Sequence, residues 1–325
     1  MRRPTQSYGR RRGGGLGGRL PILVLGLVGL AFYWFSNQQT VPFSDRKQFV
    51  TVPIEDAAKL GAQSYLQILQ NEPGGVMCGT GRCSQAEADI VRKVRKIGTD
   101  LERAAIQLEQ DLLSQGYKFT PVAEAFDWQY NVVPSNQPNA FCLPGGYVAV
   151  YTAIMDVAGD ADGTFEPIED LQDPDKLAVI MGHEIGHALA HHGAERMSQQ
   201  KIVQFGQMAV GVGLGGMDVG QQQAIMQAFG MAAQGSILKF SREHETEADK
   251  IGLDLLVRAC YDPREAPELW ERMSQLGGGE RPPEWMSTHP ASETRAENFR
   301  RWMPDAIAYY ERNCCLLYTS PSPRD

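Results

Sequence analysis

Residues 181–187 read Met-Gly-His-Glu-Ile-Gly-His and contain the motif H-E-x-x-H. On a helix, residues four apart lie on one face, so His183 and His187 can offer two imidazole nitrogens to a single metal ion. Glu184 is adjacent and can reach a water on that metal without being a ligand itself. A zinc peptidase uses this arrangement, because two histidines hold Zn²⁺ while the glutamate takes a proton from the water. A core helix with two incidental histidines is the alternative interpretation.

Helix signals surround the motif. Asp173 and Pro174 offer an N-cap and a proline at the first helical position, and Gly193 stands where the helix could end. Between them lies a broad apolar face suited to a core helix, formed by Leu177, Ala178, Ile180, Met181, Ile185, Ala188 and Leu189. We therefore expect one buried helix that carries the motif.

The start of the chain is basic and the remainder is acidic. The 325 residues carry a net charge of −8, and residues 1–44 contain six arginines and no acidic residue, which leaves −14 for residues 45–325. An acidic globular part argues against nucleic acid as a partner.

Residues 20–35 (LPILVLGLVGLAFYWF) contain no charged side chain, and we interpret them as a transmembrane anchor. Sixteen helical residues span about 24 Å, slightly less than a bilayer core of about 30 Å, but Arg19 can snorkel and Tyr33, Trp34 and Phe35 suit an aromatic belt. A cleaved signal peptide, without a small-x-small site here, and a mitochondrial presequence are the alternatives. The positive-inside rule predicts a cytoplasmic N-terminus and an extracytoplasmic catalytic domain, on the periplasmic side of a bacterial inner membrane or in an organellar inner membrane.

The six cysteines fit an oxidising compartment. Cys78 and Cys83 flank a glycine-rich turn and could close a small disulfide loop, whereas Cys142 and Cys260 could pair or remain buried thiols. The chain has no C-x-x-C pair, so we expect no zinc site built from cysteines.

Several elements precede the motif. We expect a linker over residues 36–53, a helix over about 54–70, and a long helix opened by the capping box of Ser84 and Glu87. Residues 126–133 alternate between apolar and polar side chains, and residues 147–151 follow a Pro-Gly-Gly turn, which indicates two strands. These strands predict a small sheet beside the metal helix, with an open edge to which an extended peptide could add.

After the metal helix, residues 206–220 are rich in glycine and apolar side chains. We interpret them as a flexible connection or lid, with packed helix ends as the alternative. Further on, residues 241–252 (SREHETEADKIG) carry several carboxylates, which could form no more than a charged helix face.

The order of H-E-x-x-H, S-R-x-x-E-x-x-A-D and a late T-H-P resembles the zinc metallopeptidase family that includes HtpX and the type I CaaX prenyl proteases. Within that family, the chain is similar to the single-anchor or periplasmic branch of BepA and LoiP and to the mitochondrial Oma-type peptidases. The resemblance runs from about Arg46 to Asn313. It includes the Asn139-Ala-Phe segment, but this chain has one apolar segment where HtpX-like members have several spans.

The resemblance implies that Glu245 is the third zinc ligand, with Glu243 and Glu247 as the rival acids. It implies that Asp249 accepts a hydrogen bond from a ligand histidine and that Arg295 orients the last loop. His289 matches the family's late histidine, which would either stabilise the oxyanion of the tetrahedral intermediate or act as a removable fourth ligand. An ordinary loop histidine is the alternative for His289.

Together these features predict an α+β, mainly α, zincin-like metallopeptidase domain over residues 54–313, with a small β-sheet beside the active-site helix. The domain follows a basic segment (1–19), a transmembrane helix (20–35) and a linker (36–53). It precedes a tail (314–325) that fits no element.

The predicted function is that of a membrane-anchored zinc endopeptidase that holds one Zn²⁺ per chain. Polypeptide substrates would lie along Asn139, Tyr147, Val148 and Ala149, and the resemblance implies quality control of misfolded membrane or envelope proteins. A non-catalytic, zinc-containing assembly factor or chaperone on the same fold is the alternative. Glu184 argues against it, because only hydrolysis needs that base.

Overall fold

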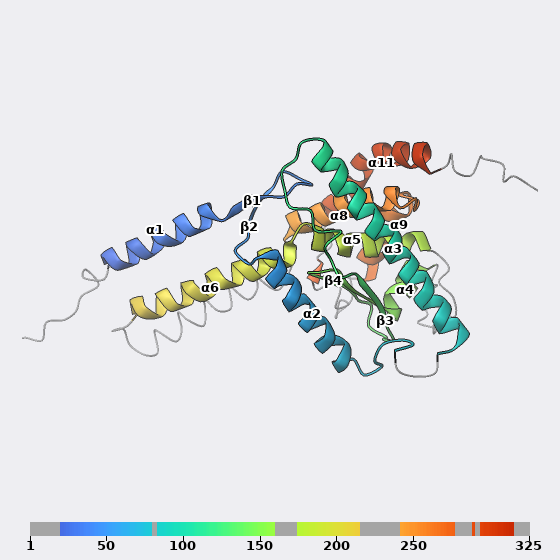
Figure 1. The fold of residues 1–325 in the computed structure, drawn as a ribbon, viewed down its shortest axis with the longest axis horizontal. Coiled ribbons are helices and arrows are strands. Elements are labelled where there is room, and N and C mark those ends of the chain that lie inside the picture. Colours follow the sequence, from blue (N-terminus) through green and yellow to red (C-terminus); the bar gives the residue numbers. More distant parts are fainter. Residues whose placement is uncertain are drawn as a thin grey trace, which may run out of the picture.

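The computed structural model describes residues 20–79, 83–159, 174–214, 241–276, 288–289 and 293–314, in which helices surround a small sheet (Figure 1). The helices are α1 (Leu20–Ser36), α2 (Ile54–Asn71), α3 (Gln85–Ser114), α4 (Thr152–Ala158), α5 (Pro174–Leu189), α6 (His192–Leu214), α8 (Arg242–Arg258), α9 (Glu265–Leu276) and α11 (Glu293–Asn313). The strands are β1 (Gln38–Thr40), β2 (Lys47–Phe49), β3 (Gln129–Val133), β4 (Ala140–Leu143) and β5 (Tyr147–Tyr151). The fold is α+β and mainly α, as the sequence predicts.

The three-stranded sheet lies beside α5 and has the order β3-β5-β4. The central strand β5 pairs in parallel with β3 and antiparallel with β4. The sequence predicts β3 and β5 but not β4, whose four residues precede the Pro-Gly-Gly turn. Gly145 (φ 98°) and Gly146 (φ 90°) adopt the left-handed conformation that reverses the chain, and this reversal lets the residues before the turn pair back onto β5.

The long helix α3 starts where the sequence predicts. The Ser84 hydroxyl accepts a hydrogen bond from the Glu87 N–H, and the Glu87 carboxylate accepts one from the Ser84 N–H, which completes the capping box. The apolar stripe of α3 joins the main core through Ile90, Val94, Ile97, Leu101, Ala104 and Leu108. The stripe is therefore a core-packing face of the domain.

Small residues let α5 and α8 cross at very short range. A Cβ atom added to Gly186 would lie 2.8 Å from the carbonyl oxygen of Ala248, and one added to Gly252 would lie 2.9 Å from the backbone nitrogen of His183. Both neighbours are backbone atoms, which cannot move aside as the end of a flexible side chain can. Glycine at these positions is what brings the motif of α5 against the carboxylates of α8.

The segment that we expected to be a plain linker, residues 36–53, contains the antiparallel pair β1 and β2. The Trp34 ring at the end of α1 stacks on Phe49 of β2, with ring centroids 4.5 Å apart. Helices α1 and α6 project side by side from the body of the molecule, and β1 and β2 lie at the base of α1 (Figure 1). Within the described part of the chain, we find no helix that is both long enough and apolar enough to cross a membrane.

The end of α5 differs from the prediction. Helix α5 stops at Leu189, because His191 adopts a left-handed conformation (φ 58°), and α6 starts at His192. Gly193 therefore lies in the first turn of α6 and does not end the metal helix. The glycine-rich segment continues α6 as far as Leu214, so its first part is helical and is not a loose connection, while residues 215–220 lie outside the described residues.

Two disulfide bonds join Cys78 to Cys83 and Cys260 to Cys314. The first is the loop that the sequence suggests, but the second excludes a bond between Cys142 and Cys260. Cys142 is a buried free thiol. Cys314 is also buried, so the packed domain includes this residue and does not end at 313.

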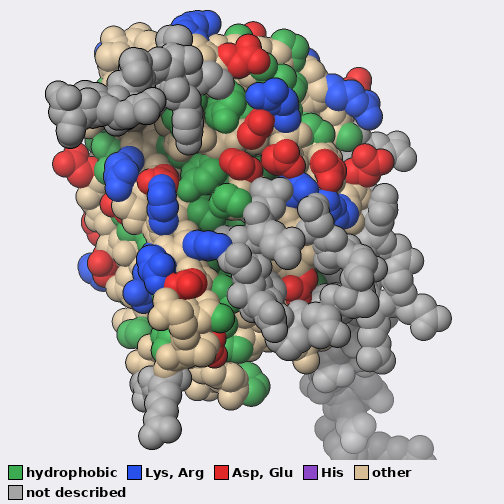
Figure 2. Space-filling view, turned by 90° about the vertical axis from the view of Figure 1, so that its right-hand side faces the viewer, with side chains coloured by type: hydrophobic (Ala, Val, Ile, Leu, Met, Phe, Trp, Pro, Cys, Tyr) green, Lys and Arg blue, Asp and Glu red, His purple; other side chains and the backbone are tan. Residues whose placement is uncertain are grey.

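Charged side chains of both signs are interspersed on the face shown in Figure 2, with apolar side chains between them. In the described chain as a whole, several oppositely charged pairs follow helical spacing, such as Lys250 and Asp254 on α8, whose Nζ and Oδ1 atoms are 3.1 Å apart. Exposed pairs of this kind each contribute little to stability. On this face, the described residues do not gather into a broad basic surface.

Candidate metal centre

Five residues that the sequence selects meet in one buried place. His183, Glu184 and His187 come from the C-terminal half of α5, Glu245 from the first turn of α8, and His289 from the short described segment 288–289. Each is at most 3% exposed. Burial of this many ionisable side chains is costly unless they are paired or hold a metal ion.

The ligand atoms of four of these residues converge. The Nε2 atoms of His183 and His187 are 3.1 Å apart, and each lies 3.5 Å from an oxygen of Glu245. The Nδ1 atom of His289 lies 3.1 Å from Glu245 Oε1 and 3.4 Å from His183 Nε2. All four residues offer ligand atoms within 4.8 Å of one another.

This donor set fits a zinc ion. Four ligand atoms arranged tetrahedrally at about 2.0–2.1 Å from a zinc ion lie about 3.3 Å from one another. The distances of 3.1–3.5 Å given above between the ligand atoms of this group are close to that value. Glu245 Oε2 is buried and accepts no well-aligned hydrogen bond from the described residues, although Arg295 Nη1 and His183 Nε2 lie 3.3 and 3.5 Å from it. Two histidines and one glutamate form a ligand set of the catalytic zinc type.

Two of the ligand side chains, Glu245 and His187, are held in the protonation states that bind a metal. Burial would raise the pKa of Glu245, but His289, His183 and Arg295 hold that pKa well below its usual range, so the side chain stays a carboxylate. Burial and the neighbouring histidines hold the pKa of His187 well below its usual range, so its ring is neutral. A carboxylate and a neutral imidazole are the forms that bind a metal. Burial and Arg295 would lower the pKa of His183, but its carboxylate partners Asp249 and Glu245 outweigh them and raise that pKa to about 9 in the metal-free protein.

Asp249 contacts a ligand histidine, as the family resemblance implies. The Nδ1 atom of His183 is 2.9 Å from Asp249 Oδ1, one helical turn after Glu245 on α8. Arg295 on α11 donates to both oxygens of Asp249, from Nε at 2.6 Å and from Nη2 at 2.8 Å, and its guanidinium lies 3.6 Å from the centre of the Trp270 ring. Because Asp249 accepts from Nδ1, the lone pair of Nε2 is left to face the converging ligand atoms.

The Nη1 atom of Arg295 also lies 3.3 Å from the Oε2 atom of Glu245. The sequence predicts that Arg295 orients the last loop through carboxylates. Among the described residues it contacts Asp249 and Glu245 of α8, and also the rings of His183 and Trp270.

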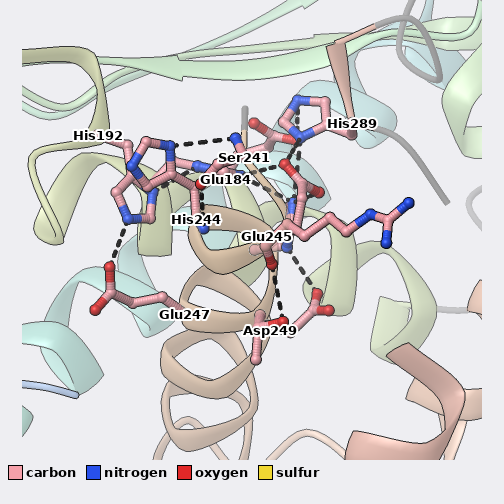
Figure 3. A network of polar contacts seen from close by, with 12 residues as sticks. Glu184, His192, Ser241, His244, Glu245, Glu247, Asp249 and His289 are labelled. Carbon is pink, nitrogen blue, oxygen red and sulfur yellow. Dashed lines mark hydrogen bonds and ion pairs between the residues drawn. The ribbon is translucent and has the colours of Figure 1, made fainter. Parts of the chain in front are cut away.

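The rival acids of α8 take other positions. Glu243 is exposed, while Glu247 is buried and turns to His192, with 2.7 Å between Glu247 Oε2 and His192 Nε2 (Figure 3). Among these three glutamates, only Glu245 joins the group of converging ligand atoms.

Sequence reasoning missed a second polar network beside this group. Arg46, in the segment between β1 and β2, donates to Glu247 and also to Glu195 of α6. The Nε2 atom of His244 lies 2.9 Å from the Oε2 atom of Glu195. The ring of His244 stacks on the ring of His192, with centroids 4.3 Å apart. The signal available in the sequence was a histidine five residues after His187, but its partners are too distant in the chain to be recognised from spacing.

Glu184 and His289 face a cleft. They line a cavity of about 530 Å³ together with His187 and with residues of α2, β4 and β5. The Nε2 atom of His289 is 3.6 Å from Glu184 Oε1. A cleft of this size beside a set of metal-ligand atoms can admit a segment of polypeptide.

The predicted substrate-binding residues are only partly in this cleft. Asn139 lines it, but Tyr147, Val148 and Ala149 lie in the central strand β5, which is hydrogen-bonded on both sides. A central strand has no free edge to offer to a peptide, so β5 does not provide the open edge that the sequence predicts. The strand that lines the cleft is β4, and within the described residues it pairs only with β5.

Comparison with known proteins agrees with this arrangement. Residues 106–303 match Peptidase family M48, and the chain belongs to that family. It is therefore a metallopeptidase.

The chain is similar to the mitochondrial metalloendopeptidase OMA1 of Saccharomyces cerevisiae, with 28% identity over 301 residues that cover 90% of this chain and 77% of the yeast protein. It is 32% identical over 218 residues to the mitochondrial metalloendopeptidase OMA1 of Bos taurus, covering 63% of this chain and 38% of that protein. It is 28% identical over 177 residues to the beta-barrel assembly-enhancing protease of Escherichia coli, covering 53% of this chain and 34% of that protein.

Proposed function

We propose that this metallopeptidase is a membrane-anchored zinc endopeptidase with one Zn²⁺ held by His183, His187 and Glu245. The observation that carries the proposal is the convergence of these three ligand atoms beside Glu184, at the wall of a cleft. When bound there, zinc would supply the positive charge that makes a water acidic enough to lose a proton near neutral pH.

Glu184 is the general base of the proposed reaction. It follows His183 on α5 and lines the cleft, so its carboxylate can accept the proton of the attacking water. The same carboxyl group then delivers the proton to the nitrogen of the leaving amine. Hydrolysis therefore needs no further acid.

His289 has two candidate roles. Its Nδ1 atom lies among the ligand atoms of Glu245 and His183, which suits a removable fourth ligand in a resting state. Its Nε2 atom faces the cleft side of Glu184, which suits stabilisation of the oxyanion. A His289→Ala variant separates the two, because loss of a resting ligand raises activity and loss of an oxyanion donor lowers it.

The substrate would bind as an extended peptide along the edge of β4 that pairs with no other strand of the described residues. The backbone groups on that edge can pair with a peptide strand, and Asn139 immediately precedes β4. A peptide in this position passes the wall of the cleft that contains Glu184 and His187.

We place the chain in a membrane on the evidence of its N-terminal segments. The uncharged residues 20–35 follow a basic segment, and α1 presents exposed apolar side chains such as Leu25, Phe32 and Phe35. The proposed topology has a cytoplasmic N-terminus and an extracytoplasmic peptidase domain, in a bacterial envelope or an organellar inner membrane. Because its relatives are mitochondrial metalloendopeptidases and a beta-barrel assembly-enhancing protease, we propose misfolded membrane or envelope proteins as substrates.

Casein degradation by the full-length protein tests the proposal, with zinc content measured on the same samples. We expect one zinc per chain, cleavage that a chelator abolishes, and a loss of at least about 10²-fold in rate for Glu184→Gln with zinc retained. Glu243→Gln is the matched control, because this exposed glutamate of α8 lies outside the ligand group and its loss should leave the rate unchanged.

Two outcomes would contradict the proposal in different ways. Stoichiometric zinc without cleavage of any polypeptide would favour a zinc-containing assembly factor or chaperone on the same fold. Folded protein that binds no zinc would exclude both functions.

A further inference from the structure

His187 contacts a second histidine through Nδ1 as well as Glu245 through Nε2. Its Nδ1 atom lies 2.8 Å from the Nδ1 atom of His192, the first residue of α6. At this distance one of the two nitrogens carries the hydrogen and the other accepts it, since two N–H groups cannot face each other.

Glu247 decides which tautomer His192 adopts. The carboxylate oxygen of Glu247 lies 2.7 Å from His192 Nε2 and can only accept, so His192 carries a hydrogen on Nε2 (Figure 3). Neutral His192 is then an acceptor at Nδ1, and His187 must donate from its own Nδ1. The lone pair of His187 is therefore at Nε2, the atom that faces His183 and Glu245.

Arg46 fixes Glu247 in turn. Its Nε and Nη2 atoms donate to Glu247 Oε2 at 3.0 and 2.8 Å, and the Ser44 hydroxyl donates to the other oxygen of Glu247. Arg46 is also held by both oxygens of Glu195. Ser44 and Arg46 belong to the segment between β1 and β2. The chain of contacts that begins at His187 therefore runs through His192 and Glu247 to the β1–β2 hairpin.

We propose that His192, Glu247 and Arg46 form a positioning relay that keeps the Nε2 lone pair of His187 directed at the metal. The proposal rests on the proposed function, because it takes His187 as a zinc ligand. Each member acts through the next, and none of the three touches the substrate or the metal. The relay makes the strength of metal binding depend on the docking of the β1–β2 hairpin, which follows α1.

The test measures zinc affinity in the full-length protein by competition with a chromophoric chelator. His192→Phe keeps a flat ring to stack on His244 but removes both hydrogen-bonding nitrogens, and we expect the zinc Kd to rise about 10–100-fold. His192→Asn retains an acceptor near the position of Nδ1 and should recover most of the affinity. The visible absorption of the cobalt-substituted protein should change in His192→Phe, because the geometry of His187 changes.

His191→Asn is the matched control. His191 precedes His192 and adopts a left-handed backbone conformation (φ 58°) that asparagine tolerates, and it is not a member of the relay. Its zinc Kd and cobalt spectrum should equal those of the wild type. If His192→Phe does not fold, as judged by circular dichroism, Arg46→Gln probes the other end of the relay at a partly exposed side chain and should raise the Kd by up to about tenfold.

The outcomes separate the two proposals. Suppose that the wild-type protein binds zinc and that His192→Phe has the same zinc Kd and the same cobalt spectrum. This result would overturn the relay and leave the proposed function intact. If His192→Phe does not fold, an unchanged zinc Kd in Arg46→Gln would have the same meaning. Folded wild-type protein that binds no zinc would overturn the proposed function and the relay with it.

Discussion

The two histidines of α5 are held by two different polar arms. The His183 arm runs directly to Asp249 of α8 and then to Arg295 of α11. The His187 arm places His192 in between, continues to Glu247 of α8, and ends at Arg46 near the start of the domain. Both arms direct Nε2 at the converging ligand atoms, but they connect the centre to opposite ends of the described chain.

The difference is also one of burial. The side chain of Arg295 is 6% exposed and that of Arg46 is 17% exposed. The first arm therefore belongs to the rigid interior, whereas the second reaches a boundary where a small hairpin docks. We infer that the first arm mainly preserves the centre and that the second can transmit a displacement of the N-terminal segment.

The largest expected effect concerns the two arginines. Arg295→Met leaves Asp249 and Glu245 buried without their cation and should lower the free energy of unfolding of the metal-free protein by about 3–5 kcal/mol. Arg46→Met should cost about 1–3 kcal/mol, because its site is partly open to water. Urea unfolding in the presence of a chelator measures both losses, and a larger loss for Arg46→Met would reverse our assignment of the rigid arm.

The second expected effect depends on pH. Burial would raise the pKa of Glu195, but hydrogen bonds from His244 and Arg46 outweigh it and lower that pKa to about 2. A lowered pKa in the folded state gives stability that is present above the ordinary value of 4.5 and is lost as the pH falls towards 2.

Glu195→Gln should therefore cost about 1.5–3 kcal/mol at pH 7. The difference in free energy of unfolding between Glu195→Gln and the wild type should narrow progressively below pH 4.5. Urea unfolding at a series of pH values from 7 to 3 measures it, and a difference that stays constant across this range would show that the Glu195 charge does not support the His187 arm.

The third expected effect concerns the crossing where the two arms meet. Gly186→Ala places a Cβ atom against the backbone of Ala248 and should cost about 1–3 kcal/mol, while separating His187 from Glu245 and weakening zinc binding. Gly159→Ala is the control, because its added Cβ would meet nothing closer than 3.6 Å. Equal thermal midpoints and zinc affinities for Gly186→Ala and the wild type would contradict the close crossing.

The smallest expected effect is a test of connection within the His187 arm. If Arg46 acts through Glu247 and His192, adding Arg46→Gln to His192→Phe should change the zinc Kd by less than about twofold, since the relay is already broken. Chelator competition on the double variant measures this. Additive changes would show that Arg46 supports the metal by another route.

Much of the centre could be predicted from local sequence. The positions of His183, Glu184 and His187 follow from helical periodicity, and the capping box of Ser84 follows from its own four residues. Glu245, Asp249 and Arg295 were implied by family resemblance, and they lie where that resemblance places them. Their roles in binding and catalysis stay predictions until the variants are measured.

The errors have a common cause. Strand β4 was missed and β5 was expected to offer an open edge, because strand order depends on which chains pair in space and the alternation of side chains does not record it. The bond between Cys260 and Cys314 was missed for a similar reason, since spacing alone does not determine disulfide connectivity.

By itself, the sequence determined the metallopeptidase class, the helix that carries the motif and the mainly α character of the domain. These depend on residue identity and on periodicities of a few residues. Only the tertiary structure decided which carboxylate each histidine meets and which strand lines the cleft. It also revealed that Arg46 joins Glu247 across 201 residues of sequence. Such contacts arise from the packing of α5 against α8 and from the docking of the hairpin, and local propensity does not encode either of them.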